Sequence, residues 1–420
     1  MGPSPYGRFS LTSKLGIKMA KDLWSDNYAS RANGLSASEV RALFAVVSRP
    51  EVVSLAGGMP FVPALPKERM IESFNSLMKD RSNIALQYSG GQGDPTLREH
   101  VREIMALEGI KSDIENIVIT TGSQHGLDLV SSLFLDPGDV VLAEGPSYVG
   151  ALGVFRARQA HIEHVYTDLE GISPEALSAT IERVKAAGKT IKFLYLVPNF
   201  ANPSGVTLSA DRRAKVLEIC RKHHILVLED NVYGLLYFED RAPDALRSLD
   251  EDGVIYLGSF SKILVPGFRV GYVLAPPSIR EKLVLANESA VLCPSEFSQL
   301  MISEYLSTND WKAQIAVFRG EYKARRDAAL AAMNEFLPDL TTTKPGGGFY
   351  LWVDLPKGVN SKAMLPRAVD NLVAYTPGTA FYGNGTGQEF LRISYSYPTP
   401  ENIRVGVERL AKTISEELAS

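Results

Sequence analysis

The sequence lacks the features of secreted, membrane-spanning and nucleic-acid-binding proteins. Only 2 of its 420 residues are cysteine, and Cys220 and Cys293 form no metal or redox motif, which favours a reducing compartment. Its 44 basic residues do not outnumber the 48 acidic ones, whereas a general nucleic-acid binder shows a basic excess. No run of about 18 apolar residues and no signal-peptide pattern occur, so neither a membrane span nor secretion is expected. These absences favour a cytoplasmic protein that binds neither nucleic acid nor membrane.

What is present is a globular composition and an alternation of short apolar runs with helical stretches. Apolar residues make up 45% of the chain, enough for a sizeable core. The runs have no two-residue period, so we expect an α/β fold whose mainly parallel sheet is covered by helices on both faces. Helices between the strands are expected, for example, over 126–134 and 211–222. Seven strands are expected, at residues 117–120, 140–143, 164–166, 193–197, 225–228, 254–257 and 270–274.

The C-terminal part of the sequence changes to an α+β pattern. A long helix is expected over 296–336, strands over 348–353 and 391–395, and a closing amphipathic helix over 400–418. This change of pattern predicts a second, smaller domain.

Three parts of the chain are therefore expected. Residues 1–58 form an N-terminal arm that packs on the small domain and contains a helix over 36–47, which starts with a capping-box pattern. Residues 59–309 form the large domain, and residues 310–420 form the small one.

The strongest single motif surrounds Lys262, which follows a predicted strand and lies among apolar and small residues. Burial there would favour the neutral, nucleophilic form of its amine. Ser259, Ser261 and Arg269 add hydroxyl groups and a fixed cation, which suit a phosphate ester beside a reactive amine. An isolated lysine in a loop is more often a surface residue. The other motifs described below favour a functional role for Lys262 instead.

Two more strand ends offer polar groups. Asp230 ends an apolar strand, where open α/β sheets place their ligands, and Tyr233 follows closely enough to serve the same site. Asp230 or Glu229 could instead cap a helix. Asn202 offers a side-chain donor in an Asn-Pro-Ser-Gly turn, although such a turn alone is usually only structural.

A fourth strand end, at residues 119–126, runs through a glycine into a helix start. Free backbone N–H groups and the helix dipole make such a start an anion cradle, and Ser123 as an ordinary N-cap is compatible with it. A cradle, an acid, an amide and an amine could converge on one crevice. Pyridoxal phosphate has a matching inventory: a phosphate, a carbonyl for Lys262 and a ring nitrogen for Asp230.

This ordered set of motifs resembles the fold-type I, class I/II aminotransferases that use pyridoxal phosphate. The closer likeness is to the 2-aminoadipate and kynurenine aminotransferase branch, which is also similar to the C-terminal domain of MocR-type regulators. It covers about residues 36 to 415. It is carried by residues 54–60 (SLAGGMP), Tyr88, Leu97-Arg98, 122–124 (GSQ), 146–148 (PSY), 202–205 (NPSG), 230–233 (DNVY), 259–262 (SFSK), Arg269 and 391–394 (LRIS).

The resemblance implies a role for each matching residue. Lys262 would hold the cofactor aldehyde as a Schiff base, and Asp230 would pair with the pyridine nitrogen. Tyr233 and Asn202 would hold the ring oxygen, and Tyr148 would stack on the ring. Tyr88 would reach the phosphate from the neighbouring subunit of a homodimer that shares its active sites. The remaining phosphate-binding residues would be Ser123, Gln124, Ser259, Ser261 and Arg269.

The implied activity is transfer of an amino group from an L-amino acid to a 2-oxo acid, with 2-oxoglutarate as the expected acceptor. Arg392 would grip the substrate α-carboxylate with help from Asn202 and the Gly58 backbone. Lys262 would act as base at Cα and as acid at the cofactor carbon, in a ping-pong cycle.

The side-chain preference depends on the N-terminal helix. Ser38 and Arg41 match positions that touch a distal substrate carboxylate in the aminoadipate branch. If Arg41 points inward, dicarboxylic substrates fit; if it points outward, it is a surface cation and a broader specificity follows.

Two other functions use the same fold. A β-lyase would share the carbanion chemistry, and a cofactor-sensing regulator domain would share the MocR likeness, although about 35 residues before the matched region are few for a DNA-binding domain. We expect no metal site, because His161 and His164 alternate with other residues within a predicted strand.

Overall fold

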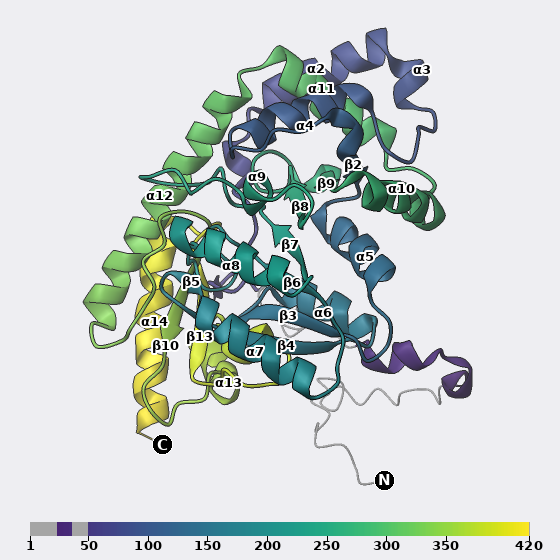
Figure 1. The fold of residues 1–420 in the computed structure, drawn as a ribbon. Helices are drawn as coiled ribbons and strands as arrows, with labels where there is room; N and C mark the ends of the chain where they lie inside the picture. Colours follow the sequence, from purple (N-terminus) through teal and green to yellow (C-terminus); the bar gives the residue numbers. More distant parts are fainter. Residues whose placement is uncertain (1–22, 36–48, 420) are drawn as a thin grey trace.

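The computed structural model describes residues 23–35 and 49–419, and an eight-stranded sheet forms its centre (Figure 1). The order is β2-β9-β8-β7-β6-β3-β4-β5. The strands from β8 to β4 run parallel, β9 is antiparallel to β2 and β8, and β5 is antiparallel to β4. The strands are β2 (Ile117–Thr120), β3 (Val140–Gly145), β4 (His161–Asp168), β5 (Gly171–Ile172), β6 (Ile191–Leu196), β7 (Leu226–Asp230), β8 (Val254–Ser259) and β9 (Gly271–Leu274).

The prediction of a mainly parallel sheet covered by helices is confirmed, but the count of seven strands was wrong. All seven expected strands are present, β2 with the expected bounds and the other six with shifted ends, and β5 adds an eighth at the edge. Because Gly171–Ile172 contains only two residues, no period in the sequence could mark it.

Successive residues of the central strands enter two cores on opposite faces of the sheet. In β6, Phe193 and Tyr195 belong to one core and Leu194 and Leu196 to the other. Helices α7 and α8 cover the second face, and α4, α5, α6 and α10 cover the first. Their bounds are α4 (Pro95–Ala106), α5 (Ser123–Phe134), α6 (Val149–Ala157), α7 (Pro174–Ala186), α8 (Ala210–Lys222) and α10 (Pro277–Val291).

A smaller sheet with its own core forms the C-terminal part. Its order is β10-β13-β12, with β10 (Tyr350–Asp354), β12 (Thr376–Pro377) and β13 (Phe390–Ser394). One face of β10 and β13 packs against α12 and α14 through Leu351, Val353, Leu391 and Ile393. The two-residue period therefore turns Tyr350, Trp352 and Arg392 to the other face.

The expected long helix is in fact two. Helix α11 (Glu296–Thr308) ends before an extended Asn309, and α12 (Trp311–Phe336) starts where the Asp310 side chain accepts a hydrogen bond from Ala313 N. This cap explains the break. Figure 1 shows α12 in green running from the helices beside the large sheet to the yellow α14, and its buried residues join both cores.

The N-terminal arm enters the small part through β1 (Val53–Ser54), which pairs in parallel with β11 (Val373–Ala374). The helix expected over 36–47 lies outside the described residues. The limits of the three predicted parts, at 58 and 309, stay predictions. The other helices are α2 (Lys67–Asp80), α3 (Ser82–Ala85), α9 (Leu246–Leu249), α13 (Ser361–Asp370) and α14 (Pro400–Leu418), and no described helix is long and apolar enough to cross a membrane.

Candidate active site

A cavity of about 380 Å³ opens at the carboxyl ends of the parallel strands. Its large-sheet half consists of residues on the loops after β2, β3, β6, β7 and β8, and its small-sheet half consists of Gly58, Tyr350 and Arg392. The predicted residues of the large-sheet half all line the cavity: Ser123, Gln124, Tyr148, Asn202, Asp230, Tyr233, Ser259, Ser261, Lys262 and Arg269.

Three other predicted residues are not among the described residues that line this cavity. Tyr88 is 76% exposed and does not line the cavity, and its expected contact with a neighbouring subunit stays a prediction. Ser38 and Arg41 lie outside the described residues. The described residues also contain no group of histidine, cysteine and acidic side chains that could hold a metal ion.

Lys262 lies in the turn directly after β8, and its Nζ donates to the Gly58 carbonyl at 3.3 Å. Its pKa is lowered to about 8, because the amine is removed from water and the cations of Arg269 and Arg392 are near, while Asp230 opposes the shift. Roughly a tenth of the amine is therefore in its neutral, nucleophilic form at pH 7, far more than for a lysine in water.

The two carboxylates at the end of β7 have different tasks. Glu229 accepts hydrogen bonds from the backbone N–H groups of Leu246 and Arg247 and so caps α9. Asp230 faces the cavity on the opposite side of the strand, where its Oδ2 accepts from Tyr195 at 2.8 Å. Of the two alternatives that the sequence left open, Glu229 is the cap.

The second oxygen of Asp230 has no hydrogen-bond partner although it is buried. Burial raises the pKa of Asp230 to about 6, against the opposing effects of Tyr195 and Lys262. An unpaired buried carboxylate oxygen is costly, so it marks a place where a ligand cation or N–H group would bind.

An anion cradle is present at the start of α5. The N-cap is Gly122 and not Ser123, which the sequence offered as an alternative, and Gly122 has φ 79° and no side-chain cap. A Cβ on Gly122 would lie 2.5 Å from Arg269 Nη2, so glycine lets the guanidinium approach the helix start. Arg269 itself has a left-handed backbone at φ 56°, and its Nη1 donates to Ser261 Oγ at 3.3 Å.

Arg392 is the buried cation of the small-sheet half, and it is only 2% exposed. Its Nη1 donates to Asn202 Oδ1 at 2.7 Å, and its Nη2 donates to the Ala56 carbonyl and to Thr376 Oγ1. These partners are neutral, its Nε has none, and burial lowers its pKa. A buried guanidinium without a carboxylate partner is a site for an anionic ligand.

Sequence reasoning missed three residues of this environment. Tyr195 donates to Asp230, Thr376 accepts from Arg392, and Tyr350 lines the cavity between Arg392 and Tyr233. Tyr350 and Tyr195 were inside expected strands, where only the face that each residue occupies could have indicated their role.

The cavity thus joins a partly neutral amine, a free carboxylate oxygen, an anion cradle and a buried cation. A profile of the family described as aminotransferase class I and II matches residues 59–410. The chain belongs to the class I and II aminotransferases.

Individual relatives of this aminotransferase are similar over nearly their full length. It is 38% identical over 397 residues to aromatic-amino-acid aminotransferase 1 of Thermococcus litoralis, covering 93% of this chain and 94% of that protein. It is 36% identical to the 2-aminoadipate transaminase of Thermus thermophilus, covering 94% of this chain and 98% of that one. It is 39% identical to the kynurenine aminotransferase of Pyrococcus horikoshii, solved with PMP, with a TM-score of 0.90 over 94% of this chain and 98% of that chain.

These findings confirm the predicted family, the type I fold and the activity class. This aminotransferase transfers amino groups and uses pyridoxal 5'-phosphate. The residues present fit that cofactor, because the anion cradle suits its phosphate, the unpaired Asp230 Oδ1 suits its ring N–H and Lys262 suits its aldehyde.

Proposed function

We propose that this aminotransferase moves an amino group from an L-amino acid to a 2-oxo acid, 2-oxoglutarate in particular, by a ping-pong mechanism. The observation that carries the proposal is the meeting of Lys262, Asp230 and Arg392 in one cavity. The cytoplasmic location predicted from the composition is part of the proposal.

The residues of the large-sheet half would hold the cofactor. When bound, pyridoxal phosphate supplies an aldehyde and a ring that accepts electrons from the substrate Cα. Lys262 would bind the aldehyde and Asp230 the ring nitrogen, while Tyr233 and Asn202 would bind the ring oxygen and Tyr148 the ring face. The phosphate would be held by Ser123, Gln124, Ser259, Ser261 and Arg269.

Lys262 would also carry the proton. Because its pKa is lowered to about 8, its Nζ can take a proton from the substrate Cα and return it at the cofactor carbon that receives the nitrogen. Its hydrogen bond to the Gly58 carbonyl shows how a displaced amine can stay at the edge of the cavity.

Arg392 would bind the α-carboxylate of both substrates. Its guanidinium, oriented by Asn202 and Thr376, offers the directed donors that a carboxylate requires, and the Gly58 backbone lies beside it in the cavity wall. One such site serves the amino donor and then the 2-oxo acid in turn, which is the order of a ping-pong cycle.

The acceptor preference rests on Ser38 and Arg41, which would contact a distal carboxylate as in the aminoadipate branch. The similarity to a protein named 2-aminoadipate transaminase supports this assignment. A homodimer would place Tyr88 at the phosphate of the neighbouring subunit, and the high exposure of Tyr88 in one chain supports that role.

Single-turnover spectroscopy of the holoenzyme tests the proposal. Adding L-glutamate or another amino acid should convert the lysine-bound cofactor to its pyridoxamine form, and adding 2-oxoglutarate should reverse the change. Borohydride reduction followed by peptide mapping should find the cofactor on Lys262. A label on another amine would overturn the assignment of Lys262. Pyruvate release from a substrate with a β-leaving group, without conversion by any amino acid, would favour a lyase instead.

The distal contact has its own test. Arg41→Gln should raise the KM for glutamate and 2-oxoglutarate while leaving the KM for an aromatic amino acid unchanged. Unchanged glutamate kinetics would rule out the contact.

A further inference from the structure

Tyr350 is the first residue of β10, and its hydroxyl lies where the two halves of the cavity meet. The side chain is 2% exposed. Its oxygen is 3.4 Å from Asn202 Nδ2 and 3.3 Å from the Tyr233 hydroxyl. Its ring faces the Arg392 guanidinium, whose carbon is 4.3 Å from the ring centroid. One phenol therefore touches a residue assigned to the substrate and two assigned to the cofactor.

The direction of these hydrogen bonds follows from Arg392. The guanidinium can only donate, so Asn202 Oδ1 accepts from it and the amide nitrogen of Asn202 faces Tyr350. That nitrogen donates to the Tyr350 oxygen, which leaves the Tyr350 proton free for Tyr233. Tyr233 can then donate its own proton into the cavity. Either hydroxyl can donate across the 3.3 Å contact between Tyr350 and Tyr233. When Tyr350 is the donor, the donors of Arg392, Asn202, Tyr350 and Tyr233 all point toward the cavity.

Tyr233 stays protonated at the end of this chain. Burial and the nearby Tyr350 hydroxyl raise its pKa well above the usual range. A neutral phenol is a donor whose strength depends on what is donated to its oxygen, since hydrogen bonds in series polarise one another.

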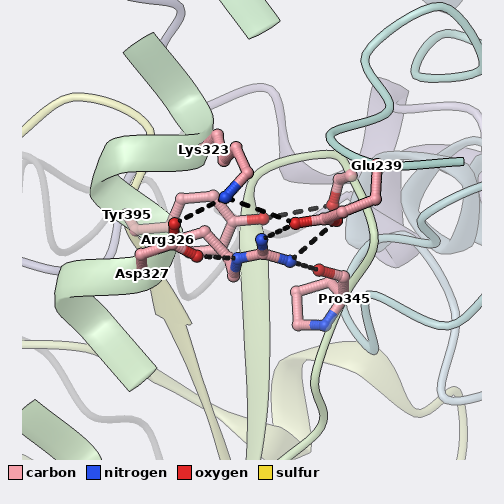
Figure 2. A network of polar contacts seen from close by, with 7 residues as sticks. Glu239, Lys323, Arg326, Asp327, Pro345 and Tyr395 are labelled. Carbon is pink, nitrogen blue, oxygen red and sulfur yellow. Dashed lines mark hydrogen bonds and ion pairs between the residues drawn. The ribbon is translucent and has the colours of Figure 1, made fainter. Parts of the chain in front are cut away.

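The backbone on both sides of the Tyr350–Tyr233 contact is held by a polar network on α12 (Figure 2). Buried Arg326 donates to the Pro345 carbonyl at 2.6 Å and pairs with Glu239, which also pairs with Lys323. The Tyr395 hydroxyl donates to the Gly347 carbonyl at 3.1 Å.

Backbone hydrogen bonds complete this attachment. Phe238 N donates to the Gly346 carbonyl at 2.7 Å, and Gly348 N donates to the Leu236 carbonyl at 3.0 Å. The segment that leads into Tyr350 is therefore fixed to the segment that follows Tyr233. On the opposite side of the Tyr350 hydroxyl lies Gly58. A Cβ at this position would lie 1.9 Å from the hydroxyl oxygen, so the Gly58 backbone packs directly against it.

We propose that Tyr350 is a positioning residue that couples the occupancy of Arg392 to the donor strength of Tyr233 at the cofactor ring oxygen. The coupling rests on the proposed roles of Arg392 and Tyr233. A carboxylate bound to Arg392 neutralises the guanidinium charge and so weakens its hydrogen bond to Asn202. Because the hydrogen bonds are in series, the hydrogen bond that Tyr233 donates at the end of the chain is weakened as well. A carboxylate that arrives with the substrate would in this way raise the proton affinity of the lysine-bound cofactor.

The test is a pH titration of the holoenzyme's visible absorbance, with and without 3-phenylpropionate, a carboxylate that has no amine to react. In the unsubstituted enzyme the carboxylate should raise the apparent pKa of the chromophore. Tyr350→Phe keeps the ring against Arg392 and removes the hydroxyl. Its chromophore pKa should be higher by about 0.5 without ligand, and its response to the carboxylate should fall by at least half. The dissociation constant of the carboxylate should change less than about 3-fold, because Arg392 keeps its own contacts.

Tyr375→Phe is the matched control, since it removes another buried tyrosine hydroxyl, one that donates to the Ser361 carbonyl away from the cavity. It should leave both titrations unchanged. An equal carboxylate response in Tyr350→Phe and the unsubstituted enzyme would overturn the coupling, and so would a response lost equally in Tyr375→Phe. Those results leave transamination intact, whereas an unsubstituted enzyme with no lysine-bound chromophore would overturn the proposed function itself.

Discussion

The two halves of the cavity are built differently. The large-sheet half combines a lysine, a carboxylate and an anion cradle on five strand ends, and its charged groups oppose one another. The small-sheet half contains one charged side chain, Arg392, whose hydrogen-bond partners Asn202, Ala56 and Thr376 are all neutral. Under the proposed function, chemistry and recognition of the substrate carboxylate would be carried by separate parts of the fold. Substitutions in one half should therefore alter different constants from substitutions in the other.

The largest effect should come from the large-sheet half, at Lys262. Lys262→Ala removes the amine that we propose binds the cofactor aldehyde and carries the proton, so the single-turnover rate should fall by about 10⁴-fold. Stopped-flow absorbance with an amino acid measures it. Lys282→Ala, which removes an exposed lysine on α10, is the control and should leave the rate unchanged. A Lys262→Ala rate within about 100-fold of the unsubstituted enzyme would show that another group moves the proton.

Arg392→Gln, in the small-sheet half, should weaken substrate binding and leave cofactor binding almost unchanged. Loss of the charged donors should lower kcat/KM for every α-amino acid by about 100-fold, mainly through KM, because about 3 kcal/mol of charge-assisted hydrogen bonding is lost. The cofactor dissociation constant, measured by fluorescence titration of the cofactor-free protein, should change little. With 2-phenylethylamine, which has no carboxylate, the variant and the unsubstituted enzyme should have the same kcat/KM. If the affinity for the cofactor fell as much as kcat/KM, Arg392 would also serve the cofactor, and the division of roles between the two halves would be wrong.

The neighbouring carboxylates of β7 sharpen the comparison within the large-sheet half. The pKa of Asp230 is raised from 3.8 to about 6, so the fold favours its protonated form. The contribution of this protonated side chain to the free energy of unfolding is complete below about pH 4 and is lost as the pH rises through 6. At pH 8 the ionised side chain therefore costs the cofactor-free protein up to about 3 kcal/mol. Asp230→Asn should raise the free energy of unfolding at pH 8, have little effect at pH 4, and still abolish transamination.

Glu229→Gln is the matched substitution one residue away. Burial raises the pKa of Glu229 as well, but both of its oxygens accept backbone N–H groups of α9, whereas one oxygen of Asp230 is unpaired. Gln keeps one acceptor and turns an NH₂ group toward the other N–H, so the substitution should destabilise the protein at pH 8 by about 1–3 kcal/mol. The active site should keep its spectrum. Urea unfolding of both variants at the two pH values measures the difference. Equal destabilisation by Asp230→Asn and Glu229→Gln would contradict the assignment of Asp230 to a ligand.

The large-sheet half could be predicted well from the sequence because of its topology. Parallel strands bring their carboxyl ends to one edge, so motifs after four apolar runs had to converge, and the family resemblance added Tyr148 after a fifth. The choice between Glu229 and Asp230 could not be made, since it depends on which face of β7 meets α9. The eighth strand and the break between α11 and α12 at Asp310 could not be predicted, because each involves too few residues to form a pattern in the sequence.

The small-sheet half was predicted less completely. Arg392 was found through its motif, but Tyr350 was only part of an expected strand. Its place beside Asn202 and Tyr233 depends on the register of β10 with β13, in which Tyr350 pairs with Ser394 and Trp352 with Arg392. Register between strands about 40 residues apart is set by packing of the whole sheet and cannot be read from a short motif.

The smallest expected effect is at the anion cradle. Ser261→Ala removes a hydroxyl that lines the cavity and accepts a hydrogen bond from Arg269 Nη1. The cofactor-free protein should bind pyridoxal phosphate and inorganic phosphate about 5- to 10-fold more weakly, which corresponds to the loss of one hydrogen bond of about 1 kcal/mol. The KM for amino acids at saturating cofactor should stay the same, because Arg392 and Asn202 are untouched. Ser132→Ala, which removes a hydroxyl bonded within α5, is the control and should bind both ligands normally. If Ser261→Ala raised the amino-acid KM and left phosphate binding unchanged, the anion cradle would belong to the substrate and the division between the halves would be wrong.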